Sequence, residues 1–225
     1  MKIGLIGYGK MGKTIEALAV QAGHEVVEKY NSQNPFLEAN QCNADVLIEF
    51  TLPKFAVSHI EKALELNVPI VVGTTGWNDQ EASVKKQVEE SNGSLFYASN
   101  FSIGVHLFFE INKQLSAWMK REDYRLGVHE IHHTEKLDAP SGTALTLLNK
   151  IQETNAGAAC EITHDRIENV PGTHIVRWEN EIDEITLEHK AKNRNGFAMG
   201  SIRAAEFLHN KKGVFGMEDL LKLNK

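Results

Sequence analysis

The chain has 225 residues, 42% of them hydrophobic, and a formal net charge of -6, which is typical of a globular protein with room for one large domain or two small ones. The acidic balance argues against a broad nucleic-acid surface, which needs a basic face. Isolated cysteines at Cys42 and Cys160, an N-terminus unlike a signal peptide and the lack of a long apolar run predict a cytoplasmic protein with no membrane span.

The first thirty residues predict a nucleotide-binding β-α-β unit. An apolar strand over Lys2–Ile6 leads into a GYGKMG turn, then an amphipathic helix and a second strand over His24–Tyr30. In this GxGxxG pattern Gly7 permits the tight turn, Gly9 admits the pyrophosphate and Gly12 lets the helix pack on the strand. Alone, the motif would fit any glycine-rich turn. Its flanking elements favour a dinucleotide site.

The residues after the second strand bear on the choice of nucleotide. Asn31 stands where such sites usually have the carboxylate that accepts from the ribose 2′-hydroxyl of NAD. Without that carboxylate a 2′-phosphate meets no repulsion, and Lys29, Asn31 and Ser32 can all donate to it. We therefore expect NADPH to be tolerated, although these residues would also fit an ordinary solvated loop.

Strands and helices continue to alternate up to about residue 103. Strands over Ala44–Phe50, Pro69–Val72 and Ser94–Ala98 alternate with helices over Lys54–Leu66 and Asp79–Asn92. This order predicts a parallel sheet that binds ligands at the carboxyl ends of its strands. The motifs GTTG and ASNF follow two such ends and are expected to approach the nicotinamide. From these patterns the residues expected at the cofactor are Gly7, Gly9, Gly12, Asn31, Ser32, Gly73, Thr74, Thr75, Asn100 and Phe101.

The pattern changes in the second half of the chain. The elements predicted there are a helix over Gly104–Lys120 with an apolar stripe of Leu107, Phe108, Ile111 and Leu115, a strand over Tyr124–Val128, a helix from Ser141 to about Glu153, strands over Cys160–Val170, Thr173–Glu179 and Glu184–Lys190, and a helix over Phe197–Leu208. Strands without helices between them favour a largely antiparallel or mixed sheet.

These elements predict an α/β protein with two domains. Residues 1–103 form an N-terminal Rossmann dinucleotide-binding domain, and residues 104–201 form a C-terminal α+β domain with a mixed, largely open sheet. A C-terminal helix over about 202–225 is expected to pack back onto the first domain. The second domain would bind substrate and carry the contacts between subunits.

The segment over residues 128–144, VHEIHHTEKLDAPSGTA, concentrates titratable groups beside a turn. Its HEIHH string matches the HExxH zinc signature, which needs a helix so that His129 and His133 share one face. Here a strand precedes the string and Pro140 follows within a turn or two. A zinc site is therefore disfavoured, and His129 is expected to be structural.

Proton transfer and anion binding are the favoured interpretation of this segment. His132 or His133 can exchange a proton near neutral pH, and Lys136 adds a second cation. Gly142 and Thr143 lie at the start of a predicted helix, where backbone N–H groups can hold a carboxylate. The alternative is that His132 alternates on a strand and Lys136 is a solvated loop charge.

The same residues resemble the dihydrodipicolinate reductase family, also called the 4-hydroxy-tetrahydrodipicolinate reductase family. The segments that carry the resemblance are EIHH at 130–133, KLDAPSGTA at 136–144, GYGKMG at 7–12, GTTG at 73–76, ASNFSIGV at 98–105, EHKAKNR at 188–194 and IRAA at 202–205. The resemblance covers essentially the whole chain. It implies NAD(P)H-dependent reduction of the cyclic product of aspartate-semialdehyde and pyruvate to tetrahydrodipicolinate, in diaminopimelate and lysine biosynthesis.

The resemblance also implies roles for single residues. His132 would be the proton donor and Lys136 a second proton donor, while His133, Gly142 and Thr143 would contact the substrate carboxylates. The whole first glycine turn, including Tyr8, Lys10 and Met11, and the segment Ala98–Phe101, including Ser99, would join Gly73–Thr75 in contacting the nicotinamide cofactor. The cofactor would be NADPH or NADH, with no metal, and the protein would be a homotetramer joined through its C-terminal sheets.

Two departures from the family pattern leave the nucleotide preference open. GYGKMG is one residue shorter than the common GxxGRMG form, and the ribose region reads Tyr-Asn-Ser in place of an acidic-basic pair. Two other functions remain as alternatives, a zinc-dependent hydrolase and a non-catalytic NAD(P)H sensor.

Overall fold

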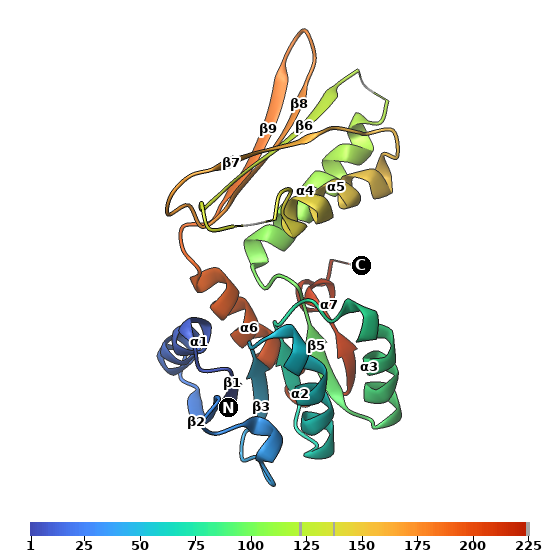
Figure 1. The fold of residues 1–225 in the computed structure, drawn as a ribbon. Helices are drawn as coiled ribbons and strands as arrows, with labels where there is room; N and C mark the ends of the chain where they lie inside the picture. Colours follow the sequence, from blue (N-terminus) through green and yellow to red (C-terminus); the bar gives the residue numbers. More distant parts are fainter. Residues whose placement is uncertain (122, 137, 224–225) are drawn as a thin grey trace. The chain divides into compact units, whose positions relative to one another are not determined.

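The computed structural model describes residues 1–121, 123–136 and 138–223, and the chain folds into two compact units (Figure 1). Unit 1 comprises Met1–Ser102 and Asn195–Lys225, and unit 2 comprises Ile103–Arg194. The chain thus returns to unit 1 at Asn195, ahead of the predicted boundary after residue 201. No helix within the described ranges is long and apolar enough to span a membrane.

Unit 1 is built on a six-stranded parallel sheet with strand order β10-β5-β4-β3-β1-β2. Its strands are β1 (Lys2–Ile6), β2 (Glu25–Tyr30), β3 (Val46–Glu49), β4 (Ile70–Val72), β5 (Ser94–Tyr97) and β10 (Gly213–Phe215). Its helices are α1 (Lys10–Gln21), α2 (Pro53–Glu65), α3 (Asn78–Glu90), α6 (Asn195–Leu208) and α7 (Met217–Leu221), with a short 3-10 helix at Phe36–Glu38.

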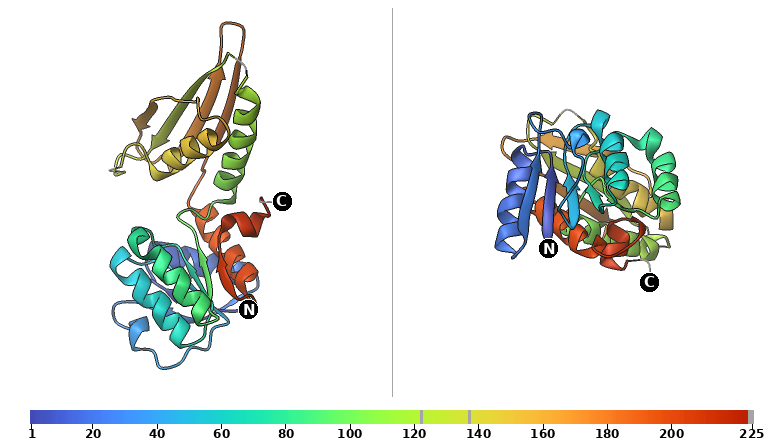
Figure 2. Two further views of the ribbon diagram at one scale, coloured as in Figure 1. Left: turned by 90° about the vertical axis from the view of Figure 1, so that its right-hand side faces the viewer. Right: turned by 90° about the horizontal axis from the view of Figure 1, so that it is seen from below.

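The central strands of unit 1 are largely apolar because helices cover both faces of the sheet. All four residues of β3 are buried, as expected for a parallel strand with no solvated side. Helices α1 and α6 pack together on one face and α2 with α3 on the other (Figure 2). The predicted Rossmann domain is confirmed, and its sheet gains an unpredicted edge strand because β10 pairs with β5.

Unit 2 is a four-stranded mixed sheet with strand order β7-β6-β8-β9. Its elements are α4 (Ile103–Met119), β6 (Arg125–His132), α5 (Gly142–Thr154), β7 (Ile162–Arg166), β8 (Thr173–Glu179) and β9 (Glu184–Lys190). Strands β6 and β7 are parallel, whereas β6–β8 and β8–β9 are antiparallel. Helices α4 and α5 lie together on one face of the sheet (Figure 2). The predicted mixed sheet is confirmed.

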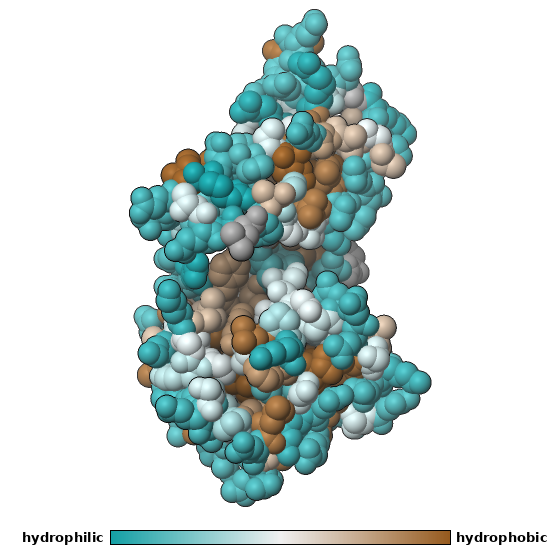
Figure 3. All heavy atoms as spheres, viewed as in Figure 1, coloured by the Kyte–Doolittle hydropathy of each residue, from teal (hydrophilic) through white to brown (hydrophobic). Residues whose placement is uncertain are grey.

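The buried face of α4 differs from the predicted stripe. Leu107 and Ile111 are 44% and 53% exposed, whereas Val105, Phe108 and Phe109 are buried. Several faces of this helix are apolar, and its packing on α5 and the sheet selects the face that carries two phenylalanines. Figure 3 shows apolar side chains exposed over α4 and α5.

Strand β6 is longer than predicted. It extends past Val128 to His132, because β7 and β8 pair with it on both sides. The HEIHH string therefore lies mostly on a strand between two neighbours, and its alternate side chains point to opposite faces of the sheet.

Candidate functional site

The candidate proton-transfer residues of unit 2 lie where β6 ends and α5 begins. His132 is the last residue of β6 and is 7% exposed, and His133 follows it at the start of the loop. The Nδ1 atom of His133 is buried and has no hydrogen-bond partner among the described residues. Gly142 and Thr143 form the first turn of α5. The structure thus gathers the predicted substrate-side residues within one β-loop-α segment.

A buried carboxylate lies behind His132. Glu130 is 0% exposed and points to the same face of β6 as His132. Its Oε2 lies 3.5 Å from Nδ1 of His132 and 3.8 Å from Nε2 of His174 on β8. Its Oε1 accepts a hydrogen bond of 3.0 Å from the backbone N–H of Ser141. Glu130 therefore connects β6, β8 and the start of α5.

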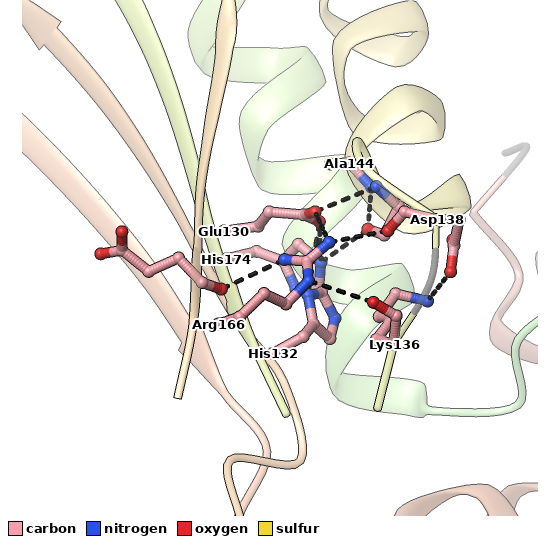
Figure 4. Close-up of polar contacts among 9 residues, drawn as sticks. Glu130, His132, Lys136, Asp138, Ala144, Arg166 and His174 are labelled. Atoms are coloured by element: carbon pink, nitrogen blue, oxygen red, sulfur yellow. Dashed lines mark hydrogen bonds and ion pairs between the residues drawn. The ribbon is translucent and has the colours of Figure 1, made fainter. Parts of the chain in front are cut away.

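Arg166 joins this carboxylate to the loop after β6 (Figure 4). Its guanidinium lies 3.5 Å from Oε1 of Glu130. Nε donates to the carbonyl of Lys136 at 3.3 Å, and Nη2 donates to the carbonyl of Asp138 at 2.7 Å. A planar guanidinium with five donors can make these contacts together, which a lysine cannot. Arg166 thus holds the backbone that carries Lys136.

The start of α5 already attracts negative charge. Ser141 caps the helix by accepting a 3.1 Å hydrogen bond from the N–H of Ala144. The ion pair with Lys136 at 2.8 Å, together with a hydrogen bond from the N–H of Gly142, holds the pKa of Asp138 below its usual value. A Cβ added at Gly142 would meet no atom within 4 Å. This N-terminus is therefore open, and it favours anions.

Burial dominates the protonation of the two clustered histidines. Burial lowers the pKa of His132, Glu130 acts in the opposite direction, and the cations Lys136 and Arg166 lower it further. Burial and the neighbouring His132 lower the pKa of His174 to about 4. Both imidazoles therefore favour the neutral form in the free protein at neutral pH. An anionic ligand beside His132 would raise its pKa again.

The zinc-hydrolase geometry is not formed. His129 points to the sheet face opposite Glu130 and His132, and its ring contacts Thr163 Oγ1 at 2.9 Å and Asp165 Oδ2 at 3.4 Å. It cannot share a metal with the histidines at the end of the strand. The carboxylate of Glu130 and the two buried imidazoles do lie within 4.8 Å of one another. Arg166 supplies the positive charge there, so we interpret the group as a cluster of hydrogen-bonding and charged residues.

In unit 1 the glycine motif has the close contacts of a phosphate-binding turn. Gly7 has φ +96°, and a Cβ on it would lie 2.0 Å from the carbonyl oxygen of Phe50. A Cβ on Gly12 would lie 2.3 Å from the carbonyl oxygen of Gly7, so the first turn of α1, which includes Lys10 and Met11, packs tightly on the turn that follows β1. A Cβ on Gly9 would meet no atom within 4 Å, which leaves room for a ligand at the helix N-terminus.

A cavity of about 570 Å³ adjoins this turn. It is lined by Gly7, Tyr8, Gly9, Asn31 and Ser32, which were predicted to bind cofactor, and by a larger apolar set that was not predicted. The unpredicted lining residues are Ile6, Tyr30, Pro35, Phe36, Leu37, Thr51, Leu52, Phe55 and His59. Phe55 and His59 stack at 5.9 Å between ring centroids, which provides an aromatic wall for a planar ring.

The other predicted cofactor residues follow the neighbouring parallel strands. Gly73, Thr74 and Thr75 come after β4, and the segment Ala98–Phe101, which includes Ser99 and Asn100, comes after β5. Neither segment lines the 570 Å³ cavity, but Thr74 contacts its wall, because Oγ1 of Thr74 accepts a 2.7 Å hydrogen bond from the N–H of the lining residue Thr51. Both segments lie at the carboxyl edge of the sheet, as does the glycine turn.

Sequence reasoning missed three polar residues of the unit 2 cluster as site residues. Glu130 could have been found from the alternation of β6, since it lies two residues before His132. Arg166 and His174 carry no local signal, because they reach the cluster through pairing of β6 with β7 and β8.

Comparison with known proteins places both units in one family. The family model described as dihydrodipicolinate reductase, N-terminus matches residues 1–101, and the model described as dihydrodipicolinate reductase, C-terminus matches residues 104–221. A curated 4-hydroxy-tetrahydrodipicolinate reductase from Christiangramia forsetii is 42% identical over 233 residues, covering 98% of each chain. One from Rickettsia bellii is 33% identical over 240 residues, covering 99% of this chain and 95% of the relative.

A solved structure shares the fold. Dipicolinate-bound dihydrodipicolinate reductase from Paenisporosarcina sp. TG-14 superposes with a TM-score of 0.79 at 22% identity. The match covers 97% of this chain and 98% of that one.

Proposed function

Because the chain belongs to the dihydrodipicolinate reductase family and is an NAD(P)H-dependent oxidoreductase, we propose that it reduces 4-hydroxy-tetrahydrodipicolinate to tetrahydrodipicolinate. The reaction adds a hydride and a proton to the heterocycle and releases its hydroxyl as water. The proposal rests on one observation in unit 2: a single segment brings the buried His132 and the partly exposed Lys136 close in sequence to an open helix N-terminus. It combines groups for proton transfer with an anion site, as a dicarboxylate heterocycle requires.

The substrate-side residues divide into proton donors and carboxylate contacts. His132 is the proton donor and Lys136 a second donor in this proposal. His133 and the first-turn N–H groups of Gly142 and Thr143 hold a carboxylate, as helix N-termini do. The Asp138 carboxylate already accepts from the Gly142 N–H in this structure, which supports an affinity of the turn for anions.

The donor set of unit 1 fits a dinucleotide. A Cβ at Gly7 or Gly12 would collide with backbone, Gly9 leaves open space at the start of α1, and the adjoining cavity has an aromatic wall. These residues would hold the pyrophosphate and adenosine, and the loops after β4 and β5 would contact the nicotinamide ring. When bound, the nicotinamide supplies the hydride.

We propose that the enzyme accepts both NADH and NADPH. Asn31 takes the place of an acidic residue, and its Oδ1 accepts hydrogen bonds from the N–H groups of Gln33 at 2.8 Å and Asn34 at 3.2 Å. Lys29 is paired with Glu16 at 2.5 Å, and the Tyr8 hydroxyl also donates to Glu16. Lys29 therefore offers a 2′-phosphate a largely neutralised charge. Neither nucleotide is strongly selected.

The remaining parts of the proposal concern assembly and pathway. The sheet face of unit 2 opposite α4 and α5 carries Ile175 and Arg177, which line a shallow cavity with His129. We propose that this face joins copies of the chain into a homotetramer, which light scattering after size-exclusion chromatography tests directly. The product would enter diaminopimelate and lysine biosynthesis. The free thiols of Cys42 and Cys160 fit a reducing cytoplasm.

The decisive experiment is a coupled assay. The condensation product of aspartate-semialdehyde and pyruvate is generated in situ by the synthase that forms it. Oxidation of NADH or NADPH is then followed by the fall in its absorbance. We expect substrate-dependent oxidation of both nucleotides that a chelator does not inhibit, and a fall in turnover of about 10²–10⁴-fold for His132→Gln, as for loss of a general acid.

Each contrary result has a distinct meaning. Nucleotide binding without substrate-dependent oxidation would indicate a sensor, and activity lost on chelation would indicate a metal enzyme. Near-normal turnover of His132→Gln would remove that residue from proton transfer.

A further inference from the structure

Strand pairing in unit 2 brings a second histidine to the proposed proton donor. Glu130 and His132 lie two residues apart on β6 and therefore share one face of the sheet. Antiparallel pairing with β8 sets His174 directly opposite Glu130. The exposed fractions of Glu130, His132 and His174 are 0%, 7% and 4%. The proposed reaction as stated gives His174 no role, although it is among the most buried polar residues of the unit.

The two imidazoles share one carboxylate oxygen. Oε2 of Glu130 lies 3.5 Å from Nδ1 of His132 and 3.8 Å from Nε2 of His174. Among the described residues, neither Oε2 of Glu130 nor Nδ1 of His132 has a partner in hydrogen-bond geometry. The two rings meet edge to face, with centroids 5.1 Å apart and an interplanar angle of 73°. Nε2 of His174 also lies 3.5 Å from Oγ of Ser141, so this nitrogen faces both that hydroxyl and Oε2. Oε2 therefore has two neighbouring imidazole nitrogens, one from each ring, as its nearest possible donors.

The surroundings keep Glu130 and His132 in place. The other oxygen of Glu130 is held by the Ser141 N–H at 3.0 Å and by Arg166 at 3.5 Å, so the carboxylate cannot turn away. Gly172, just before β8, lies against the opposite edge of His132, since a Cβ there would be 3.1 Å from Nε2. The chain around β8 therefore confines the His132 ring on two sides, through Gly172 and through His174.

We propose that His174 is a positioning residue for His132, sharing Oε2 of Glu130 with it and so setting the orientation and proton affinity of the proton donor. The proposal rests on the proposed role of His132. When His132 is charged, both ring nitrogens carry hydrogen: the Nδ1–H turns to Oε2 of Glu130, and the Nε2–H is the proton passed to the substrate. Once His132 is neutral its attraction to the carboxylate weakens, the N–H of His174 shares Oε2, and solvent returns a proton to Nε2 of His132.

Charge around the pair determines the direction of the effect. The charged and titratable groups that face the two histidines are Glu130 on β6, Lys136 and Asp138 after β6, Arg166 on β7 and His189 on β9. Because burial lowers the pKa of His174 to about 4, this ring stays neutral at neutral pH and competes as a hydrogen-bond donor. If the N–H of His174 is removed, only His132 can donate to Oε2 of Glu130. That contact stabilises the charged form of His132 and therefore raises its pKa.

The test compares two substitutions that differ in one donor. His174→Phe keeps an aromatic ring against His132 but removes the N–H, whereas His174→Gln places an amide N–H close to the position of Nε2. A general acid works only while protonated, so activity falls as pH rises through its pKa. We expect the alkaline limb of kcat/KM to move upward by roughly half to one pH unit in His174→Phe and to return close to the wild-type position in His174→Gln.

A second readout does not depend on catalysis. The pKa of His132 in the free protein is measured by NMR titration, with His132→Gln used to assign its signals, and it should move in the same direction as the alkaline limb. His164→Gln is the matched control, since His164 is exposed on the neighbouring strand β7. It should shift neither quantity. If His174→Phe fails to fold, His174→Asn replaces it, because its amide ends short of Glu130.

The outcomes separate this inference from the proposed function. An unchanged His132 pKa and an unchanged alkaline limb in a folded His174→Phe or His174→Asn variant would overturn the positioning role. A shift of equal size in His174→Gln would overturn it as well, because the donor would then be irrelevant. A wild-type protein with no reductase activity would refute the proposed function, while the NMR titration would still decide whether His174 sets the pKa of His132.

Discussion

Arg166→Ala tests whether one guanidinium holds the substrate-side loop of unit 2. The side chain of Arg166 is 19% exposed and pairs with fully buried Glu130 at 3.5 Å. It also donates to the carbonyls of Lys136 at 3.3 Å and Asp138 at 2.7 Å. The substitution removes all of these contacts and leaves the Glu130 carboxylate without its cation.

The cost in stability follows from this burial. Removing one member of a buried ion pair usually costs about 3–5 kcal/mol. Because Arg166 is 19% exposed, water can enter the vacated space, and we expect a loss near the lower end, about 3 kcal/mol. Arg166→Lys keeps the charge but not the planar fork, so it should recover the ion pair and still lose about 1 kcal/mol through the loop hydrogen bonds.

The measurements are urea unfolding and steady-state kinetics. Stability and affinity for the heterocycle should both be highest in the wild type, lower in Arg166→Lys and lowest in Arg166→Ala, because the loop that carries Lys136 loosens in that order. The KM for NADH should stay unchanged, because the residues proposed to bind the nucleotide belong to unit 1. If Arg166→Ala lowers the free energy of unfolding by less than about 0.5 kcal/mol, the range of ordinary surface substitutions, then Arg166 does not hold this loop.

Two further predictions concern the nucleotide. Gly7→Ala should weaken NADH binding at least about tenfold in a fluorescence titration, because φ is +96° and the new Cβ would lie 2.0 Å from a backbone carbonyl oxygen. Gly23→Ala, also at positive φ but with no atom within 4 Å of its Cβ, is the control that should bind NADH normally. Glu16→Gln should release Lys29 and lower the KM for NADPH several-fold while leaving that for NADH unchanged. Equal KM changes for both nucleotides would show that Lys29 does not reach the 2′ position.

Local sequence patterns predicted most of the elements and part of each candidate site. Apolar runs alternating with helical patterns located every strand of the parallel sheet except β10, and the GxGxxG spacing identified the turn at Gly7. The concentration of His132, Lys136 and Gly142 in one segment likewise needed no tertiary information. Each of these signals lies within a few residues along the chain.

The tertiary structure decided which side chains meet from separate elements. The sequence shows that β7 and β8 are strands but not their register, and the register is what places Arg166 and His174 on Glu130. In the same way, packing against α5 and the sheet, and not the apolar content of α4, decided that Phe109 is buried and Ile111 exposed. Local propensity determines an element, whereas long-range pairing and packing determine its neighbours. For this reason the sequence alone could nominate His132 as the proposed proton donor, whereas the residues proposed to set its pKa emerge only from the tertiary structure.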